Sequence, residues 1–291
     1  MRQIRKVSKE KVCRQLGITR MGLYKKELRE IQQLKEAEVV ISLVSKIKEE
    51  QPRLSVRKIQ GMIQDDLDKH SIKIGRDGLL DLLREFNMLV KRKRYKHYST
   101  DSRHSFKKYP NQIKDVKPTE PNRIWVSDIT YIEGNKGFNY LSLITDAYSR
   151  KIVGHYLSDS YSVKGTIEAL KKALKDNKVE RGLIHHSDRG VQYCSKEYIS
   201  ILKRKKAVIS MTENGSPYEN AMAERVNGIL KTELLQPRYK DWQDATQAVD
   251  KAIKIYNNNR PHLSIGMLTP QKAHMKKGEL KALWKKKERQ P

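Results

Sequence analysis

IWVSDITYI, at residues 124–132, is the stretch of sequence that most restricts the fold of this chain. Its apolar and β-branched side chains predict a buried strand, yet the acidic Asp128 stands in its middle. A buried carboxylate is costly unless it is paired or binds a metal ion. The alternative is that Asp128 ends a strand on the solvent face. The first interpretation makes Asp128 a candidate functional residue.

The segments that follow predict alternating strands and helices. Two more strands are expected at 138–146 and 151–157, and then apolar residues at helical spacing indicate a helix over 162–176. The remaining expected elements are strands at 182–186 and 208–211, and helices at 195–206, 221–235 and 244–257. The chain is therefore expected to have an α/β core from residue 124 onward.

Two further carboxylates stand in equally distinct settings. Asp188, in LIHHSDRGVQY, ends a short apolar run, and Glu224, in ENAMAERVNGILKTEL, lies on an evident helix. Asp128 and Asp188 are 60 positions apart, and 35 residues separate Asp188 from Glu224. Mg²⁺ prefers carboxylates together with substrate phosphates, so these residues indicate a metal-dependent phosphoryl-transfer site. Each residue taken singly has an alternative without a functional role: Asp188 could be a turn-forming residue, and Glu224 could be an ordinary surface residue of a helix.

The charge of the chain indicates a polyanionic partner. The net charge is +27, and residues 1–110 hold 28 basic against 14 acidic residues, so the excess is spread along the chain. Nucleic acid is the commonest such partner. The alternative to a polyanionic partner is a soluble surface that merely happens to be basic. Two cysteines are too few for a disulfide framework or a structural zinc site.

The sequence contains neither a secretory signal nor a membrane span. No stretch approaches the roughly 18 apolar residues of a span, and no apolar run follows the basic N-terminus. We therefore expect a cytoplasmic, nucleoid-associated protein without a membrane partner.

The N-terminal third is expected to be all α-helical. Residues 7–30 indicate a helix-turn-helix continued by an amphipathic helix, and a second helix-turn-helix extends from Ser55 to about Phe86. A plain helical bundle is the alternative. The basic, proline-broken linker that follows offers Arg92, Lys93 and Arg94 to phosphates, unless it is only a solvated charge run. The expected parts are 1–50, 51–90, the linker 91–123, the core 124–275 and a basic tail 276–291.

Five ordered motifs carry a family resemblance. They are WVSDITYI, TDAYSRKIVGHYL, HSDRGVQYCS, NGSPYENAMAERVNGILKTEL and YNNNRPHLSIGMLTPQ. Together with the carboxylate spacing they resemble the integrase-like DDE insertion-sequence transposases, specifically the OrfB-type catalytic protein of the downstream frame. The resemblance covers about residues 5–273. It implies a ribonuclease-H-like, retroviral-integrase-like core, which fits the expected order of elements. It also implies helix-turn-helix modules before that core.

The resemblance also implies a chemistry and its partners. Asp128, Asp188 and Glu224 would be the catalytic residues and would hold two Mg²⁺ ions, for which Mn²⁺ can substitute. The substrate would be double-stranded DNA, both element ends and target, cut and then joined at one site. A homodimer or higher oligomer is expected, and an upstream-frame protein or fusion is a candidate further partner. Retroviral integrases also carry an N-terminal zinc module, but here Cys13 stands without a ligand cluster.

Several other residues receive narrower predictions. Lys231, two helical turns after Glu224, would contact DNA, or it could be an exposed helical lysine. Asn227 shares that face and would orient Glu224 or touch a phosphate. Arg189 and Gly190 would shape the turn at Asp188, residues 214–220 would form a loop beside the site, and Asp146 would cap a turn before Ser149. His185 and His186 are assigned to no metal, and one is expected in the core. Arg260, Pro261 and His262 match a C-terminal family motif, but the sequence offers no physical account of them.

Two other functions fit the same fold. A non-catalytic DNA-binding regulator would not require all three carboxylates. A ribonuclease or resolvase would cut without joining, which leaves the long basic N-terminal region without a purpose.

Overall fold

The computed structural model describes residues 8–90, 105–114, 116–134, 137–213 and 220–283. The chain divides into two compact units. The first contains residues up to Glu49 together with Ile59–Leu89, and the second contains Glu50–Lys58 and the chain from Val90 onward. Residues 50–58 therefore pack with the second unit, although the sequence places them at the start of the second helix-turn-helix segment.

The described part of the first unit is helical, as predicted. Its helices are α1 (Lys9–Gln15), α2 (Arg20–Glu50), α3 (Val56–Lys69) and α4 (Arg76–Glu85). Gly17 takes a positive φ of 63° between α1 and α2, and the hydroxyl of Thr19 accepts a hydrogen bond from Gly22 at 3.0 Å to cap α2. The buried apolar side chains include Val40, Val44, Ile63, Leu67, Leu79 and Leu83.

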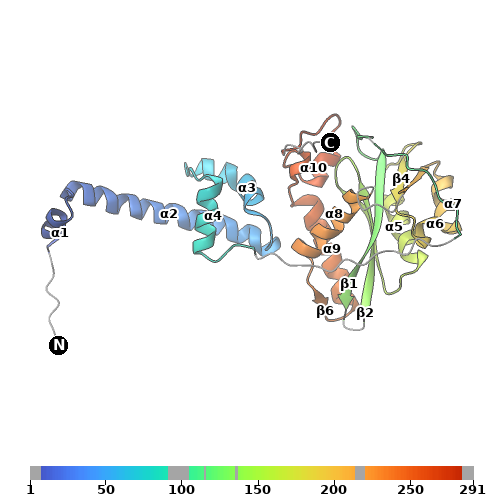
Figure 1. Cartoon of the computed structure of the whole chain (residues 1–291), viewed down its shortest axis with the longest axis horizontal. Helices are drawn as coiled ribbons and strands as arrows, with labels where there is room; N and C mark the ends of the chain where they lie inside the picture. The colour runs from blue at the N-terminus through green and yellow to red at the C-terminus, as the bar shows by residue number, and fades with distance from the viewer. Residues whose placement is uncertain (1–7, 91–104, 115, 135–136, 214–219, 284–291) are drawn as a thin grey trace. The chain divides into compact units, whose positions relative to one another are not determined.

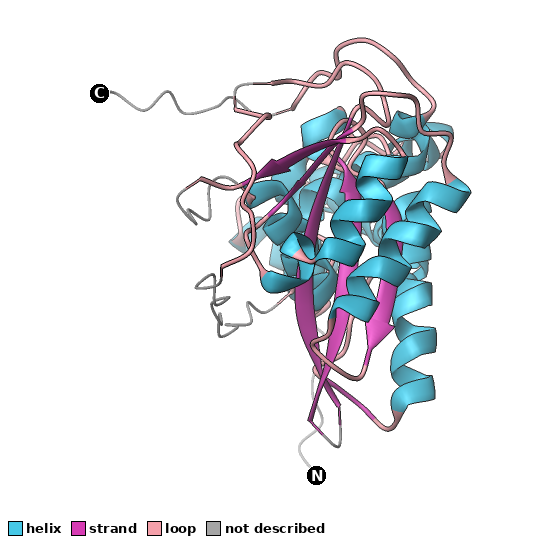
Figure 2. Ribbon diagram, turned by 90° about the vertical axis from the view of Figure 1, so that its right-hand side faces the viewer, coloured by secondary structure: helices cyan, strands magenta, loops and turns pink. Residues whose placement is uncertain are grey.

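A mixed β-sheet forms the centre of the second unit (Figure 2). Its strands are β1 (Ile124–Gly134), β2 (Gly137–Asp146), β3 (Ile152–Ser158), β4 (Ile184–Ser187), β5 (Val208–Met211) and β6 (Arg238–Tyr239). The order is β3-β2-β1-β4-β5, with β6 paired to β1. β1, β2 and β3 run antiparallel, whereas β4 and β5 continue parallel to β1. This confirms the ribonuclease-H-like α/β core that the family resemblance implied and that the expected order of elements fitted.

Helices cover both faces of this sheet (Figure 1). One layer holds α5 (Val163–Asp176), α6 (Val191–Cys194) and α7 (Lys196–Arg204). The other holds α8 (Ala221–Ile229), the π-helix η2 (Leu230–Leu234) and α9 (Trp242–Asn258). The short η3 (Leu263–Ile265) and α10 (Pro270–His274) follow. The predicted helix over 221–235 is thus an α-helix that passes into a π-helix, and α6 was not predicted.

Each helical layer shares a hydrophobic cluster with the sheet. Trp125, Ile144 and Leu170 belong to the cluster under α5–α7, and Leu143, Leu230 and Tyr256 to the cluster under α8–α9. None of the helices within the described ranges has the length and apolar character needed to span a membrane.

Candidate active site

Asp128 lies in the central strand of the sheet and faces the α8 layer. Successive strand residues point to opposite faces. Ser127 contacts the ring of buried His185 at 2.8 Å on the α7 side, while Val126 packs with Ala223 of α8. The carboxylate of Asp128 accepts a hydrogen bond from the Asn227 side-chain amide of α8 at 2.7 Å. The half-buried Asp128 is therefore held between the sheet and α8.

Asp188 lies directly after β4, the parallel neighbour of β1. Its side chain is half-buried, and its Oδ1 accepts a hydrogen bond from the Gly190 backbone N–H at 2.9 Å. A Cβ on Gly190 would stand only 3.0 Å from that same oxygen. A glycine at 190 therefore lets the turn close tightly around the Asp188 carboxylate, which is the shaping role predicted for this turn.

Glu224 lies in the first turn of α8 and is exposed. Its backbone N–H bonds to the Asn220 carbonyl at 3.2 Å. The Asn220 side chain is buried and donates to the Ser127 carbonyl at 3.1 Å. This contact fixes the start of α8 to the strand residue next to Asp128, so the helix carrying Glu224 begins beside the aspartates.

The three carboxylates interact electrostatically. The pKa of Asp128 is raised to about 8, first by burial and then by the negative charges of Asp188 and Glu224. Hydrogen bonds from the Ile129 N–H and from Asn227 oppose that rise. Negative charges that gather in this way favour binding of a cation.

The donor set fits a hard divalent cation, because all three side chains offer oxygen. The Oδ1 atom of Asn227 is buried beside them and has no hydrogen-bond partner in the structure, so it can accept one from a bound group. Among the residues that the structure describes, no three His, Cys, Asp or Glu side chains converge as a complete set of metal ligands. The carboxylates are thus electrostatically coupled without being closed around one point.

Lys231 of η2 also lies near Asp128. It is half-buried, and its ammonium lies 4.3 Å from the centre of the Tyr131 ring of β1, a cation–π contact. Burial lowers the pKa of Lys231, and the charge of Asp128 acts in the opposite direction. Lys231 is therefore not an exposed helical lysine. The sequence analysis did not find Tyr131, because nothing local links it to a lysine 100 positions away.

The two histidines before Asp188 are both buried in the structure. His185 contacts Ser127 and the Tyr198 hydroxyl at 2.8 and 2.9 Å, and His186 contacts the Ser210 hydroxyl at 2.8 Å. Burial lowers the pKa of His185 to about 3, so it stays neutral. These contacts account for both side chains as part of the core.

Asp146, at the end of β2, is held by hydrogen bonds separate from those of the three carboxylates. It is fully buried and accepts hydrogen bonds from the backbone N–H and the hydroxyl of Ser149, both at 2.7 Å. The Asn122 N–H donates to its other oxygen at 2.7 Å. It caps the turn after β2, as the sequence indicated.

Two of the sequence predictions lie outside the described residues. They concern the linker candidates Arg92, Lys93 and Arg94, and residues 214–219 of the loop expected beside the site. The structure contributes nothing on their contacts.

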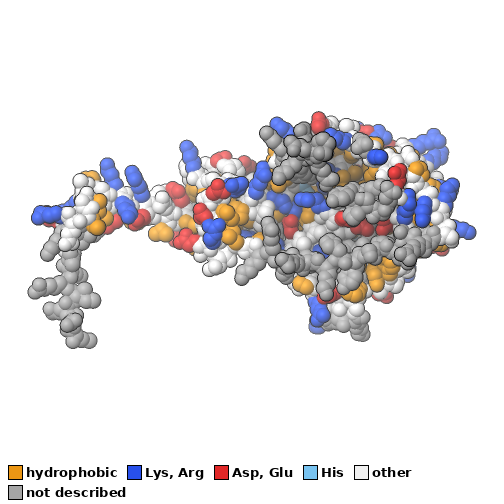
Figure 3. All heavy atoms as spheres, viewed as in Figure 1, with side chains coloured by type: hydrophobic (Ala, Val, Ile, Leu, Met, Phe, Trp, Pro, Cys, Tyr) orange, Lys and Arg blue, Asp and Glu red, His pale blue; other side chains and the backbone are white. Residues whose placement is uncertain are grey.

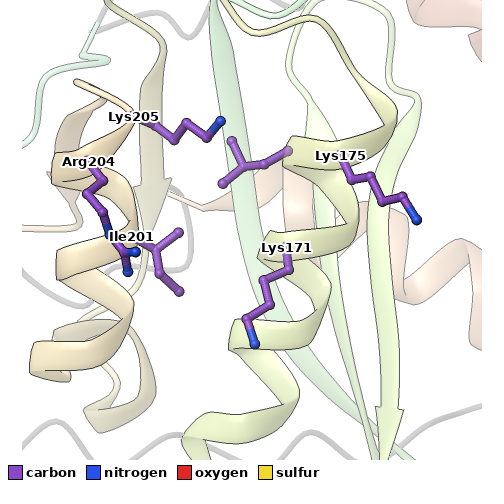
Figure 4. A pocket seen from close by; sticks show the side chains of 6 residues that line it. Lys171, Lys175, Ile201, Arg204 and Lys205 are labelled. Carbon is purple, nitrogen blue, oxygen red and sulfur yellow. The ribbon is translucent and has the colours of Figure 1, made fainter.

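A basic hollow lies between α5 and α7 (Figure 4). It has a volume of about 380 Å³, with Leu174 and Ile201 between Lys171, Lys175, Arg204 and Lys205. These helices cover the face opposite to the one Asp128 points to, so the hollow is not part of the carboxylate site. Lys175, Arg204 and Lys205 also stand at the C-terminal ends of α5 and α7, where cations complement the helix dipole.

Comparison with known proteins identifies the family of this chain. Two models described as "Integrase core domain" match residues 118–217 and 205–270. The "Insertion element IS600 uncharacterized 31 kDa protein" of Shigella sonnei is 33% identical over 264 residues, covering 89% of this chain and 96% of its own. The "Transposase for insertion sequence element IS904" of Lactococcus lactis is 36% identical over 183 residues, covering 62% and 72%.

Among solved structures, the HTLV-2 integrase catalytic core domain in complex with magnesium is also similar. It is 20% identical with a TM-score of 0.44, and the match covers 54% of this chain and 99% of that one. The family assignment rests on the sequence matches instead, which extend over nearly the whole chain and include the integrase core. The chain belongs to the integrase-like insertion-sequence transposases, the OrfB-type DDE polynucleotidyl transferases.

Proposed function

We propose that this transposase binds the terminal inverted repeats of its element and cuts and joins DNA strands at a site formed by Asp128, Asp188 and Glu224. One observation carries the proposal: Asp128 of β1, Asp188 at the end of β4 and Glu224 of α8 interact electrostatically. Burial raises the pKa of Asp128 to about 8, and the charges of the other two carboxylates add to that rise. A cluster of mutually repelling carboxylates destabilises the fold unless a cation or a proton compensates it. A bound cation would compensate that repulsion, so the cluster favours a metal-dependent reaction.

The metal-binding residues of the proposal are the same three. Asp128 would contribute to both of two Mg²⁺ ions, with Asp188 and Glu224 each holding one, and Mn²⁺ would substitute. When bound, the ions would supply Lewis-acid stabilisation of charge at phosphorus and activation of the attacking oxygen. The magnesium named for the HTLV-2 core domain is consistent with this choice.

The protein's own side chains would orient the carboxylates and bind the DNA strand. Asn227 holds the Asp128 carboxylate in one orientation through its 2.7 Å hydrogen bond. Lys231, fixed over Tyr131, presents a positive charge near Asp128, where a phosphate of the bound strand would be recognised. Water would attack the phosphodiester at the element end and break its bond to the 3′-oxygen, which leaves as a 3′-hydroxyl. That hydroxyl would then attack a second phosphodiester, forming a new P–O bond as the 3′-oxygen of the cut strand leaves.

The charge distribution supports DNA as the partner. The chain carries a net charge of +27, and Lys and Arg side chains are spread over both units on the face shown in Figure 3. In this proposal the N-terminal helices read the repeats and Arg92, Lys93 and Arg94 contact phosphates. In this proposal at least a dimer brings two ends together, and an upstream-frame protein is a further partner. The protein would act on nucleoid DNA in the cytoplasm.

The test is a cleavage and strand-transfer assay on the full chain. Labelled inverted repeats from the ends of the element are incubated with Mg²⁺ or Mn²⁺, alongside Glu224→Gln and a matched control, Glu197→Gln. Glu197 is exposed on α7, on the opposite side of the sheet. We expect metal-dependent cutting and joining that is lost only in Glu224→Gln.

Each alternative function predicts a different outcome. Tight binding of the repeats without cutting, even with the upstream frame fused, would contradict the proposal and favour a regulator. Cutting without joining, on hybrid or branched substrates, would favour a ribonuclease or resolvase.

A further inference from the structure

A buried ion pair lies at the end of the helix that carries Glu224. The Arg260 side chain is 3% exposed, and its guanidinium binds both oxygens of Glu233. The Nε and Nη2 donate at 2.8 and 2.7 Å, a bidentate pairing. Burial acts to raise the pKa of Glu233, but Arg260 and Lys58 together hold it below its usual value. Glu233 is therefore ionised and fixed.

Glu233 belongs to η2, which continues α8 without a break. It lies nine positions after Glu224 and two after Lys231. The backbone N–H of Leu235 bonds to the Leu230 carbonyl at 2.8 Å, the wider spacing of a π-helix. Any displacement of η2 would move Lys231 directly and α8 with it. The Glu233 carboxylate is thus a point at which this element is held.

A second set of contacts reaches η2 from far away in the sequence. Glu50–Lys58, which we call the strap, packs with the catalytic unit. Arg53 of the strap donates to the Thr232 carbonyl of η2 at 3.1 Å, and the Lys58 ammonium lies 3.7 Å from Glu233. Burial and the charge of Arg260 lower the pKa of Lys58 to about 8. Two strap cations therefore contact consecutive residues of η2.

The other end of the strap is tied to the residue before Arg260. Gln51 donates from its side chain to the Asn259 carbonyl at 3.3 Å, and the Asn259 side chain donates to Glu50 at 2.7 Å. The Nη1 of Arg260 also lies 3.0 Å from the Nε2 of His262. The His262 ring packs edge-on against the Tyr256 ring, with 4.9 Å between the ring centroids. The end of α9, the strap and η2 thus meet around one buried guanidinium.

We propose that Arg53 and Lys58 of the strap, together with Arg260, are positioning residues that hold η2, and through it place Glu224 and Lys231 against Asp128. This assigns a physical role to the Arg260-Pro261-His262 motif, and it rests on the proposed function of Glu224. The strap connects α2 to α3. The catalytic helix is therefore held by a segment that comes from between two helices of the N-terminal region.

Two arginines of the strap provide a matched test. Arg53 reaches η2, whereas Arg57 donates to the Leu283 carbonyl at 3.0 Å. Arg53→Ala and Arg57→Ala each remove one arginine and one hydrogen bond to a carbonyl. Arg260→Ala is not used, because it would leave Glu233 and Lys58 buried with altered charge and could unfold the protein. Arg260→Lys keeps the charge and removes the bidentate geometry.

The measurements on the full-length variants are the strand-cleavage rate at saturating end DNA, the Kd for that DNA and the melting temperature. We expect Arg53→Ala and Arg260→Lys to lower the rate by up to about a hundredfold, which is the cost of misplacing a catalytic group by about 1 Å. The Kd should stay within twofold, and Arg57→Ala should keep the wild-type rate. Equal rate losses in Arg53→Ala and Arg57→Ala, or a loss that appears only in the Kd, would overturn the proposal.

Hydrogen exchange gives a readout that does not depend on activity. Backbone amides of 230–235 should exchange faster in Arg53→Ala than in Arg57→Ala, because η2 has lost an anchor. Unchanged exchange there would overturn the positioning role even if cleavage fell. If the wild-type protein and Glu224→Gln both fail to cut, the proposed function fails, while the exchange experiment still decides whether the strap holds η2.

Discussion

The environment of Asp128 combines burial with two neighbouring negative charges and two hydrogen-bond donors. Its pKa of about 8 shows that burial and repulsion outweigh the hydrogen bonds from Ile129 and Asn227. The Asn227 amide is nevertheless the side-chain contact that fixes the direction of the carboxylate. At the scale of single residues, the asparagine is as important to the site geometry as the carboxylates are to its charge.

We therefore predict that Asn227→Ala lowers the strand-cleavage rate about ten- to a hundredfold, the usual loss when a metal ligand's outer partner is removed. The physical reason is that Asp128 becomes free to rotate and loses a compensating donor. The matched control is Asn258→Ala, an exposed asparagine near the end of α9. The expectation is contradicted if both variants cut at the wild-type rate under saturating Mg²⁺.

His262 makes stability depend on pH. Burial, and then the charges of Arg260 and Lys58, lower its pKa to about 2. Its folded pKa lies below the unfolded value near 6.5, so the unfolded chain binds the extra proton and stability falls as the pH drops below about 6.5.

Between pH 7 and pH 5 this histidine should cost the folded state about 2 kcal/mol. His262→Phe preserves a ring against Tyr256 and removes the titration. Urea unfolding at the two pH values, followed by tryptophan fluorescence, should show a difference smaller by about that amount in the variant. An identical pH dependence in both proteins would refute the assignment.

At the scale of elements, the two helical layers approach the sheet differently. α5 comes so close to β3 that a Cβ on Gly154 would stand 2.7 Å from the Ala173 Cβ and also clash with the Ala169 carbonyl. On α8, in contrast, a Cβ on Gly228 would meet nothing within 4 Å. The first glycine is required by packing, and the second is not.

Alanine at these two positions should therefore have opposite effects on stability. Gly154→Ala must displace α5 and should lower the free energy of unfolding by about 1–3 kcal/mol, the usual cost of overpacking. Gly228→Ala should raise it by up to about 1 kcal/mol, because alanine is favoured within a helix. Chemical denaturation of both variants tests the pair. Equal destabilisation would show that an added methyl group at position 228 clashes with a neighbouring atom, which contradicts this prediction.

At the scale of the whole molecule, the charge excess is shared by both units. Residues 1–110 hold 28 basic and 14 acidic residues out of totals of 61 and 34. Non-specific attraction for DNA should therefore come from many phosphate contacts over a long surface. Each contact releases a counterion, which makes the affinity sensitive to salt.

For about six to ten phosphate contacts, the affinity for end DNA should fall about 10³- to 10⁵-fold between 50 and 200 mM salt. Fluorescence anisotropy with labelled duplex at several salt concentrations measures this slope. A scrambled duplex of the same length should show a similar slope at lower affinity, since phosphate contacts carry no sequence information. An affinity independent of salt would exclude the proposed binding mode.

The sequence determined the longer elements of the second unit because their signals are local, whereas the short β6, α6, η3 and α10 were not predicted. The β-branched run around Asp128 forms β1, and the helical spacing of apolar residues places α5, α7 and α9 within a few residues of the observed bounds. The fold class and the family were confirmed, since motifs and element order are properties of the chain itself. The missed α6 has four residues and no periodicity to detect.

The tertiary structure alone decided which distant residues meet. Asn227 contacts Asp128 across 99 positions, Lys231 covers Tyr131, and Arg53 holds Thr232 across 179 positions. These contacts depend on strand register and on how α8 and η2 cross the sheet, and no local pattern encodes either. The same holds for Arg260, whose role follows only from burial beside Glu233. Sequence periodicity specifies which face of an element is buried, but the partner on that face is chosen by packing of the whole chain.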